Sequence, residues 1–228
     1  MLPFRRMRIV TRSMRTLAAL AFAGLTPAVL AEPAIVHRPA DIVDWREQRF
    51  AGRTDYALAT SPPGAPGHAA VRADCRDATA SGRLLEREVN LDETPVLAWR
   101  WRVASVYSGL DETAKDGDDY PARVYVVARR WPNFRSRAIN YVWSGSQPAG
   151  ATWENAFASQ FMMVAVRSGE GQAGEWLSER RNVAEDFRRL HDLDVDTVDV
   201  VAIMTDCDNA GGTTAAWYGP IRWLPAEP

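Results

Sequence analysis

Carboxylate side chains are concentrated in two short segments of the sequence. In the first segment, five acidic residues fall within nine positions: Asp111, Glu112, Asp116, Asp118 and Asp119. Clustered carboxylates raise one another's pKa unless a cation neutralises them. The segment is therefore a candidate for Ca²⁺ binding or for acid–base chemistry. The alternative is a solvated acidic loop in which Asp118 or Asp119 pairs with Arg123 for structural reasons.

The second segment follows the most apolar stretch of the chain and reads Thr205-Asp-Cys-Asp-Asn-Ala-Gly-Gly212. Closely spaced side-chain oxygens followed by glycines suit a hard cation, because Ca²⁺ takes about six to eight oxygen ligands. We predict Asp206 and Asp208 as metal ligands, although no Glu stands at the last position of an EF-hand loop. The alternative is an Asx turn, in which Asp and Asn side chains bond their own backbone.

Aromatic residues are the third group with binding chemistry, and the chain has 9 Trp. Flat aromatic faces stack on sugar rings, but aromatics also fill sandwich cores, where each buries about 150–250 Å². In residues 96–103 the side chains of Leu97, Trp99, Trp101 and Val103 share one face of a regular strand. We therefore assign Trp99 and Trp101 to the core.

Three other aromatics are predicted to face a ligand. Tyr125, Tyr141 and Trp143 occur in strand-like segments that also carry the polar residues Arg123 and Asn140. A strand that mixes aromatic and polar side chains suits a surface that stacks on a ring and bonds its hydroxyl groups. We predict that Tyr141 or Trp143 stacks on the ligand.

The elements that must position these residues are short strands separated by Gly, Pro, Asn and Asp. Alternation predicts strands at residues 69–75, 96–103, 122–128, 139–143, 161–167, 198–204 and 214–223. Pro220 predicts an edge or a bulge in the last of them. One amphipathic helix is predicted after Asn182, because Val183, Phe187 and Leu190 form an apolar stripe. The fold class is all-β: an antiparallel, jelly-roll-like β-sandwich with one short amphipathic helix.

The N-terminal segment has the pattern of a secretory signal peptide. Five arginines and no acidic residue precede a short apolar run, and Ala31 supplies a small residue before the expected cut at Glu32. An uncleaved membrane anchor is the alternative, but Pro27 interrupts an apolar run shorter than the roughly 20 residues that span a bilayer. We predict that residues 1–31 are removed and that residues 32–228 form one periplasmic or secreted β-sandwich domain.

Charge excludes some partners. The chain has 27 basic and 29 acidic residues, and loss of the five leader arginines leaves a net charge of −7. Such an acidic protein is a poor partner for nucleic acid or for an anionic membrane surface. No later segment approaches a membrane span, so no membrane insertion is expected after signal cleavage. HExxH, GxSxG, CxxC and Walker patterns are absent from the sequence, so nucleotide, zinc-protease and serine-hydrolase functions lack support.

Cys75 and Cys207 are the only cysteines in the sequence. Export makes a disulfide between them chemically feasible, and two separate buried thiols are the alternative. Spacing along the chain does not decide between the two, because a bridge requires Cα atoms that are close in space.

Several strings in a fixed order resemble a known family. They are Pro95-Val-Leu-Ala-Trp-Arg-Trp-Arg-Val103, Asp116-Gly-Asp-Asp-Tyr-Pro-Ala-Arg-Val-Tyr-Val126, Asn140-Tyr-Val-Trp143, Glu179-Arg-Arg-Asn-Val-Ala-Glu-Asp-Phe187, Ala202-Ile-Met-Thr-Asp-Cys-Asp-Asn-Ala-Gly211 and Ala216-Trp-Tyr-Gly219. Together they resemble the bacterial family called domain of unknown function 3047, over most of residues 45–223. The sequence departs from that pattern at Cys207, where Thr is usual, and at Pro121. The resemblance implies a single exported domain and supplies no activity. A weaker, fold-level similarity is to β-sandwich carbohydrate-binding modules.

The leading hypothesis is a non-enzymatic, exported β-sandwich that binds a polar ligand, namely a glycan or a cell-envelope component. The predicted ligand-binding residues are Asp118, Asp119, Arg123, Tyr125, Tyr141, Trp143 and Asn209, beside the metal ligands Asp206 and Asp208. No catalytic residue is assigned. One alternative is a glycoside hydrolase or lyase that pairs Asp118 or Asp119 with Asp206. A structural partner in an envelope complex is the other.

Overall fold

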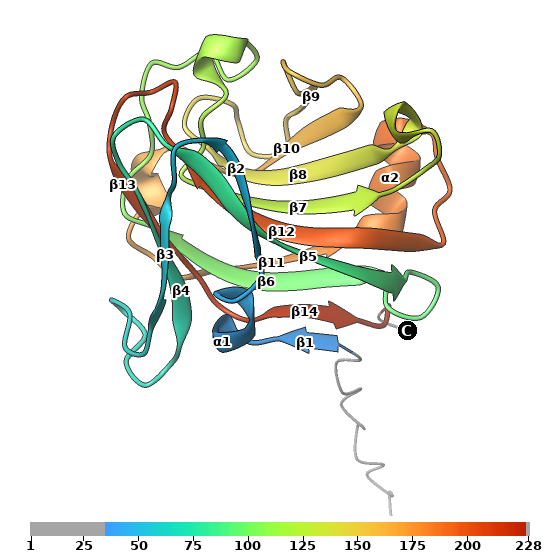
Figure 1. The fold of residues 1–228 in the computed structure, drawn as a ribbon, viewed down its shortest axis with the longest axis horizontal. Coiled ribbons are helices and arrows are strands. Elements are labelled where there is room, and N and C mark those ends of the chain that lie inside the picture. The colour runs from blue at the N-terminus through green and yellow to red at the C-terminus, as the bar shows by residue number, and fades with distance from the viewer. Residues whose placement is uncertain (1–34, 227–228) are drawn as a thin grey trace, which may run out of the picture. The chain divides into compact units, whose positions relative to one another are not determined.

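Strands that alternate apolar and polar side chains pair into two sheets, and their apolar faces meet in a common core (Figure 1). The computed structural model describes residues 35–226. The predicted signal peptide, residues 1–31, therefore lies outside the described residues. Neither described α-helix is long and apolar enough to cross a membrane.

Sheet A is entirely antiparallel and has the order β1-β14-β6-β13-β4-β3, with β11 also pairing with β6. Its strands are β1 Ile35–His37, β14 Ile221–Leu224, β6 Val96–Val103, β13 Thr214–Tyr218, β4 Ala70–Cys75, β3 Asp55–Ala59 and β11 Leu177–Asn182. The predicted strand at 214–223 is two strands. Pro220 falls between them, because proline supplies no N–H to a ladder.

Sheet B has the order β2-β5-β12-β7-β8-β10-β9. Its strands are β2 Arg46–Ala51, β5 Ala80–Asn90, β12 Thr197–Asp206, β7 Ala122–Ala128, β8 Arg137–Ser144, β10 Phe161–Ser168 and β9 Thr152–Glu154. The pair β8–β10 is parallel and the other pairs are antiparallel. The predicted all-β sandwich is confirmed, with this one parallel pair as an addition.

The core between the sheets contains a cluster of large aromatic side chains. Trp99 and Trp101 of β6 are buried there, as predicted. Their rings meet two aromatics of β8 across the sandwich, with centroids 5.4 Å apart for Trp99–Tyr141 and 6.0 Å apart for Trp101–Trp143. The prediction that Tyr141 and Trp143 face a ligand is therefore wrong, because both side chains point into the core.

The predicted amphipathic helix is α2, Val183–His191. Asn182 caps it by accepting a hydrogen bond from the backbone N–H of Glu185 at 3.2 Å. Phe187 and Val183 of this helix are buried in the core. The other described helix, α1, is a single turn at Pro39–Ile42. Three short 3-10 turns lie in connections: Lys115–Gly117, Asn133–Arg135 (η2) and Glu170–Gln172.

Candidate functional site

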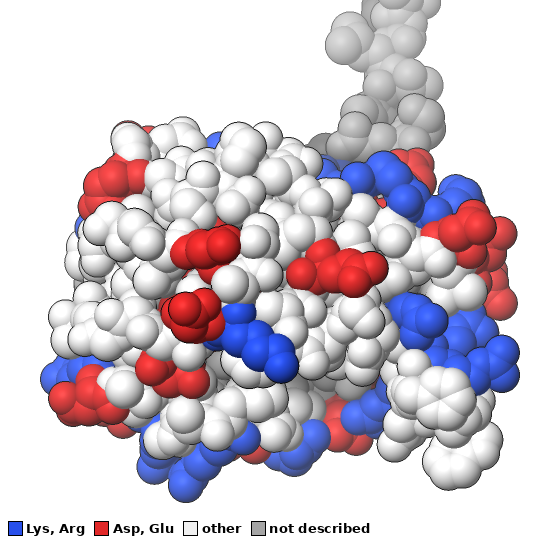
Figure 2. Space-filling view, turned by 90° about the horizontal axis from the view of Figure 1, so that it is seen from above, with Lys and Arg blue, Asp and Glu red and all other residues white. Residues whose placement is uncertain are grey.

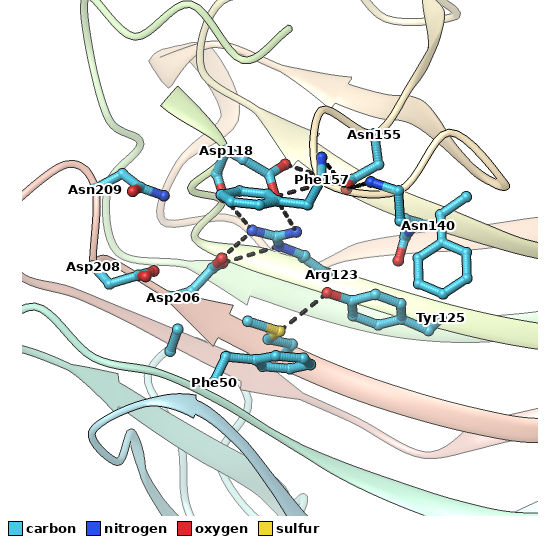
Figure 3. Close-up of a pocket in the computed structure, with 14 residues that line it drawn as sticks. Phe50, Asp118, Arg123, Tyr125, Asn140, Asn155, Phe157, Asp206, Asp208 and Asn209 are labelled. Atoms are coloured by element: carbon cyan, nitrogen blue, oxygen red, sulfur yellow. Dashed lines mark hydrogen bonds and ion pairs between the residues drawn. The ribbon is translucent and has the colours of Figure 1, made fainter. Parts of the chain in front are cut away.

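A cavity of about 420 Å³ opens on the outer face of sheet B (Figure 3). It lies on this face because strand alternation that turns Val124 and Val126 into the core turns Arg123 and Tyr125 outward. Six predicted site residues line it: Asp118, Arg123, Tyr125, Asp206, Asp208 and Asn209. The cavity therefore joins the two acidic segments that the sequence singled out.

Arg123 is the charged centre of the cavity floor and is buried. Its Nε donates to Asp206 Oδ1 at 2.9 Å, and its Nη2 also pairs with Asp206. On its other side, Nη1 lies 3.5 Å from Asp118 Oδ2. The Tyr120 ring covers the guanidinium at 4.3 Å, and the backbone N–H of Tyr120 donates to Asp206 at 3.1 Å. One guanidinium therefore holds two buried carboxylates in fixed positions.

Asn155 connects this charged floor to the cavity wall. Its Nδ2 donates to both oxygens of Asp118 at 3.0 Å. Its Oδ1 accepts from the backbone N–H groups of Phe157 and Ala158 at 3.0 and 3.2 Å. Asn155 therefore fixes the loop that carries Phe157, a role that has no periodic signal in the sequence.

Asn140 provides a hydrogen-bond acceptor without a partner. The residue is 1% exposed and lines the cavity from β8. Among the described residues, its Oδ1 atom is buried and accepts no hydrogen bond. An unpaired buried polar atom lowers the stability of the folded state by about 1–3 kcal/mol. A ligand that donates a hydrogen bond to Asn140 would remove this penalty.

Two exposed phenyl rings border the cavity. Phe50 of β2 is 68% exposed, and Phe157 of the β9–β10 connection is 60% exposed. Figure 3 shows the two rings on opposite sides, with Arg123 and Tyr125 between them. Such rings offer flat apolar faces to a bound ring. Neither phenylalanine was predicted, because neither lies in an alternating segment.

Asp119 organises the cavity loop rather than lining the cavity. It accepts from the backbone N–H of Asn209 at 2.8 Å and from that of Ala210. Oxygens of Asp119, Asp206 and Asp208 lie within 4.8 Å of one another. Glu112, from the same acidic segment, is buried and accepts from the N–H of Gly145 at 2.6 Å.

Burial shapes the acidity of these groups. It raises the pKa of the Asp206 carboxyl, and the Arg123 guanidinium opposes that shift. Burial also raises the pKa of Asp119, where the N–H of Ala210 opposes the shift and the negative charge of Asp208 adds to it. Hydrogen-bond donors placed in the cavity would stabilise the ionised form of such carboxylates.

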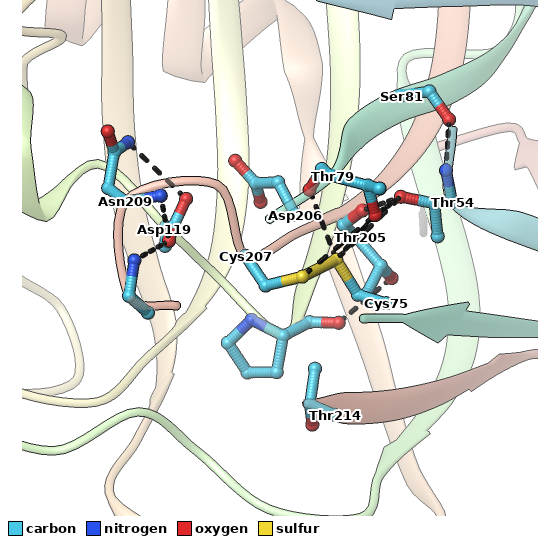
Figure 4. Close-up of a disulfide and its surroundings, with 12 residues drawn as sticks. Thr54, Cys75, Thr79, Ser81, Asp119, Thr205, Asp206, Cys207, Asn209 and Thr214 are labelled. Atoms are coloured by element: carbon cyan, nitrogen blue, oxygen red, sulfur yellow. Dashed lines mark hydrogen bonds between the residues drawn. A yellow bond between two sulfur atoms is a disulfide. The ribbon is translucent and has the colours of Figure 1, made fainter. Parts of the chain in front are cut away.

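A disulfide joins Cys75 to Cys207, with Cα atoms 6.1 Å apart (Figure 4). The sequence left open a disulfide or two separate buried thiols, and the structure contains the disulfide. Cys207 stands between the cavity residues Asp206 and Asp208, and its N–H donates to the Thr79 carbonyl at 2.9 Å. The bridge therefore fastens the loop 206–212 to the end of β4.

These features define a β-sandwich that carries a polar, aromatic-rimmed cavity on the outer face of one sheet. The chain belongs to the family described as protein of unknown function (DUF3047), whose model matches residues 43–222. The predicted family resemblance is thereby confirmed. No curated protein matches the chain in sequence.

Solved structures with a similar arrangement of strands include carbohydrate-binding modules. The family 30 module of a cellulosomal cellulase of Clostridium thermocellum is 9% identical, with a TM-score of 0.47, over 82% of this chain and 94% of that chain. The family 11 module of another cellulase of that organism is 9% identical, with a TM-score of 0.42, over 80% and 88%. The glycoside hydrolase domain of Endo-D from Streptococcus pneumoniae is 11% identical, with a TM-score of 0.43, over 81% of this chain and 22% of that one.

Proposed function

We propose that the protein binds a glycan, or another hydroxyl-rich component of the cell envelope, in the cavity of sheet B and does not transform it. The observation that carries the proposal is the unpaired acceptor of Asn140 inside a cavity bordered by Phe50 and Phe157. A sugar has hydroxyl groups that donate to such an acceptor and C–H faces that stack on phenyl rings. Asp208 and Asn209 supply further polar groups at the cavity wall.

The paired carboxylates support positioning more than catalysis. Asp118 and Asp206, which the hydrolase alternative needs as an acid and a base, are both ion-paired with Arg123. Asp206 contacts Arg123 through both oxygens, and Asp118 also accepts two hydrogen bonds from Asn155, so both carboxylates are held in place by donors. The two groups therefore suit the role of fixed acceptors beside a ligand.

The proposal predicts that Asn140→Leu weakens ligand binding without weakening the fold. Loss of one hydrogen bond should lower the affinity by up to about tenfold. Replacing an unsatisfied buried amide by an apolar side chain of similar shape should leave the free energy of unfolding unchanged or higher. Isothermal titration calorimetry with peptidoglycan fragments and neutral oligosaccharides measures the affinity, and urea unfolding measures the stability.

Phe50→Ala and Phe157→Ala should each weaken binding about fivefold through lost stacking. The control is Leu58→Ala, which alters an exposed apolar side chain on β3 outside the cavity. Absence of binding at millimolar concentrations of every sugar would overturn the proposal. Equal affinity of the cavity variants and the wild type would do the same.

The sequence predicts Ca²⁺ at Asp206 and Asp208, but the contacts that these carboxylates and Asp119 make argue against the ion. Both oxygens of Asp206 face Arg123, and Asp119 already accepts backbone N–H groups. Asp208 alone offers a carboxylate without these contacts, whereas Ca²⁺ takes about six to eight oxygens. We expect Ca²⁺ added after EDTA to leave the melting temperature unchanged. A rise would show that the native state binds the ion.

We also propose that the protein functions outside the cytoplasm, in the periplasm or as a secreted protein. The arginine-rich head and apolar run of residues 1–31 support export. The disulfide supports it as well, because disulfides persist in oxidising compartments. The mass of the exported protein should correspond to a chain that begins at Glu32, and a chain that retains residues 1–31 would contradict this proposal.

A further inference from the structure

The connection between β7 and β8 exposes two large aromatic side chains. Trp131 is 84% exposed and Phe134 is 73% exposed. These two side chains are more exposed than any other large hydrophobic side chain in residues 35–226. Neighbouring exposed aromatic side chains in one short connection are a candidate interaction surface.

The connection is ordered by its own hydrogen bonds. The backbone N–H of Arg130 donates to Ser136 Oγ at 3.0 Å, and Arg137 donates to the Phe134 carbonyl at 3.2 Å. At the start of the connection, the N–H of Arg129 donates to Asp199 at 2.6 Å. The short turn η2 lies between these contacts. The backbone therefore holds the two aromatic side chains outward in a defined conformation.

Arginines flank the aromatic pair on both sides in the sequence. Residues 129–137 contain four arginines and no acidic residue. Arg129 pairs with Glu86 at 3.0 Å, but within the described part of the chain Arg130, Arg135 and Arg137 have no carboxylate partner. Figure 2 shows Lys and Arg side chains beside protruding uncharged ones at the right-hand end, where Figure 1 places the connection between β7 and β8.

We propose that residues 129–137 form a peripheral attachment site for an anionic phospholipid surface. Indole and phenyl rings partition into the headgroup region of a bilayer, and neighbouring arginines bind lipid phosphates. The acidic net charge of the molecule argues against such contact over most of its surface. Because charge is screened beyond about 8–10 Å at physiological salt, however, the local arginines decide attachment. The site shares no residue with the cavity, so either proposal can fail alone.

Co-sedimentation of the chain from Glu32 onward with lipid vesicles tests the proposal. All described elements lie within this chain and share one core. We expect binding to vesicles of phosphatidylglycerol, little binding to phosphatidylcholine, and release at high salt. Trp131→Ser with Phe134→Ser should lower partitioning roughly tenfold or more. Arg130→Gln and Arg135→Gln should each lower it about fivefold.

The control is Leu58→Ser, which removes an exposed apolar side chain of β3 and should leave partitioning unchanged. Melting temperatures of the loop variants should equal that of the wild type, because these side chains are exposed. Failure to bind phosphatidylglycerol vesicles would overturn the proposal, as would equal binding by the aromatic double variant. Concentration-dependent dimerisation that the double variant abolishes, without vesicle binding, would assign the loop to a second copy of the chain instead.

Discussion

Arg123→Met should destabilise the folded protein by about 3–5 kcal/mol, the usual cost of removing one partner of a buried ion pair. The substitution keeps much of the side-chain volume but removes the guanidinium that contacts both Asp206 and Asp118. Both carboxylates would then be buried without a counter-charge. Urea unfolding followed by tryptophan fluorescence would measure the change in the free energy of unfolding.

Two further variants separate burial of charge from loss of an arginine. Arg129→Met removes a surface pair with Glu86, and exposed pairs contribute about 0–1 kcal/mol. Adding Asp206→Leu to Arg123→Met should recover part of the lost stability, because it removes one of the stranded carboxylates. If Arg123→Met and Arg129→Met lowered the free energy of unfolding equally, the buried ion pairs of Arg123 would contribute no more to stability than a surface pair.

The same network accounts for the part of the site that sequence reasoning located. Two acidic segments separated by 86 residues, from Tyr120 to Asp206, meet on one arginine through tertiary contacts. Charge density alone marked both segments as chemically unusual. The meeting point was predictable in outline, because Arg123 follows the first segment and shares a strand with outward-facing Tyr125.

Tyr141 and Trp143 show what alternation leaves undecided. Alternation identified the residues of β8 that share a face, but not which face meets the core. The ladder decides this, since directly paired residues lie on the same face: Val124 pairs with Tyr141, and Tyr125 pairs with Asn140. Because Val124 is in the core, Tyr141 must be there too. Asn140 lies on the opposite face with Tyr125 and lines the cavity, where the aromatic side chains were predicted.

Strand β5 and the cavity rim were missed for a different reason. Residues 80–90 carry six consecutive half-exposed or exposed positions and no alternating pattern, yet they form a long strand between β12 and β2. Pairing on both edges overrides weak local preference. Phe50 and Phe157 reach the cavity from an edge strand and a loop, where position depends on tertiary contacts such as those of Asn155.

Removal of the disulfide, by Cys75→Ser with Cys207→Ser or by reductant, should lower the free energy of unfolding by about 3–5 kcal/mol. The estimate reflects the long loop that the bridge closes, since the cysteines are 132 residues apart and the cost in the unfolded chain grows with loop length. Binding should weaken as well, because Cys207 fixes the backbone between Asp206 and Asp208 at the cavity wall.

Urea unfolding with and without dithiothreitol separates the bridge from the cysteine side chains. The wild type should lose stability when reduced, whereas the double serine variant should be insensitive to reductant and match the reduced wild type. Calorimetric titration of the same samples should show weaker sugar binding in both, because the loop 206–212 keeps its bonds to Asp119 but loses its covalent tie to β4. Equal stability of oxidised and reduced wild type would mean that hydrogen bonds alone hold this loop, and that the bridge neither stabilises the fold nor shapes the cavity.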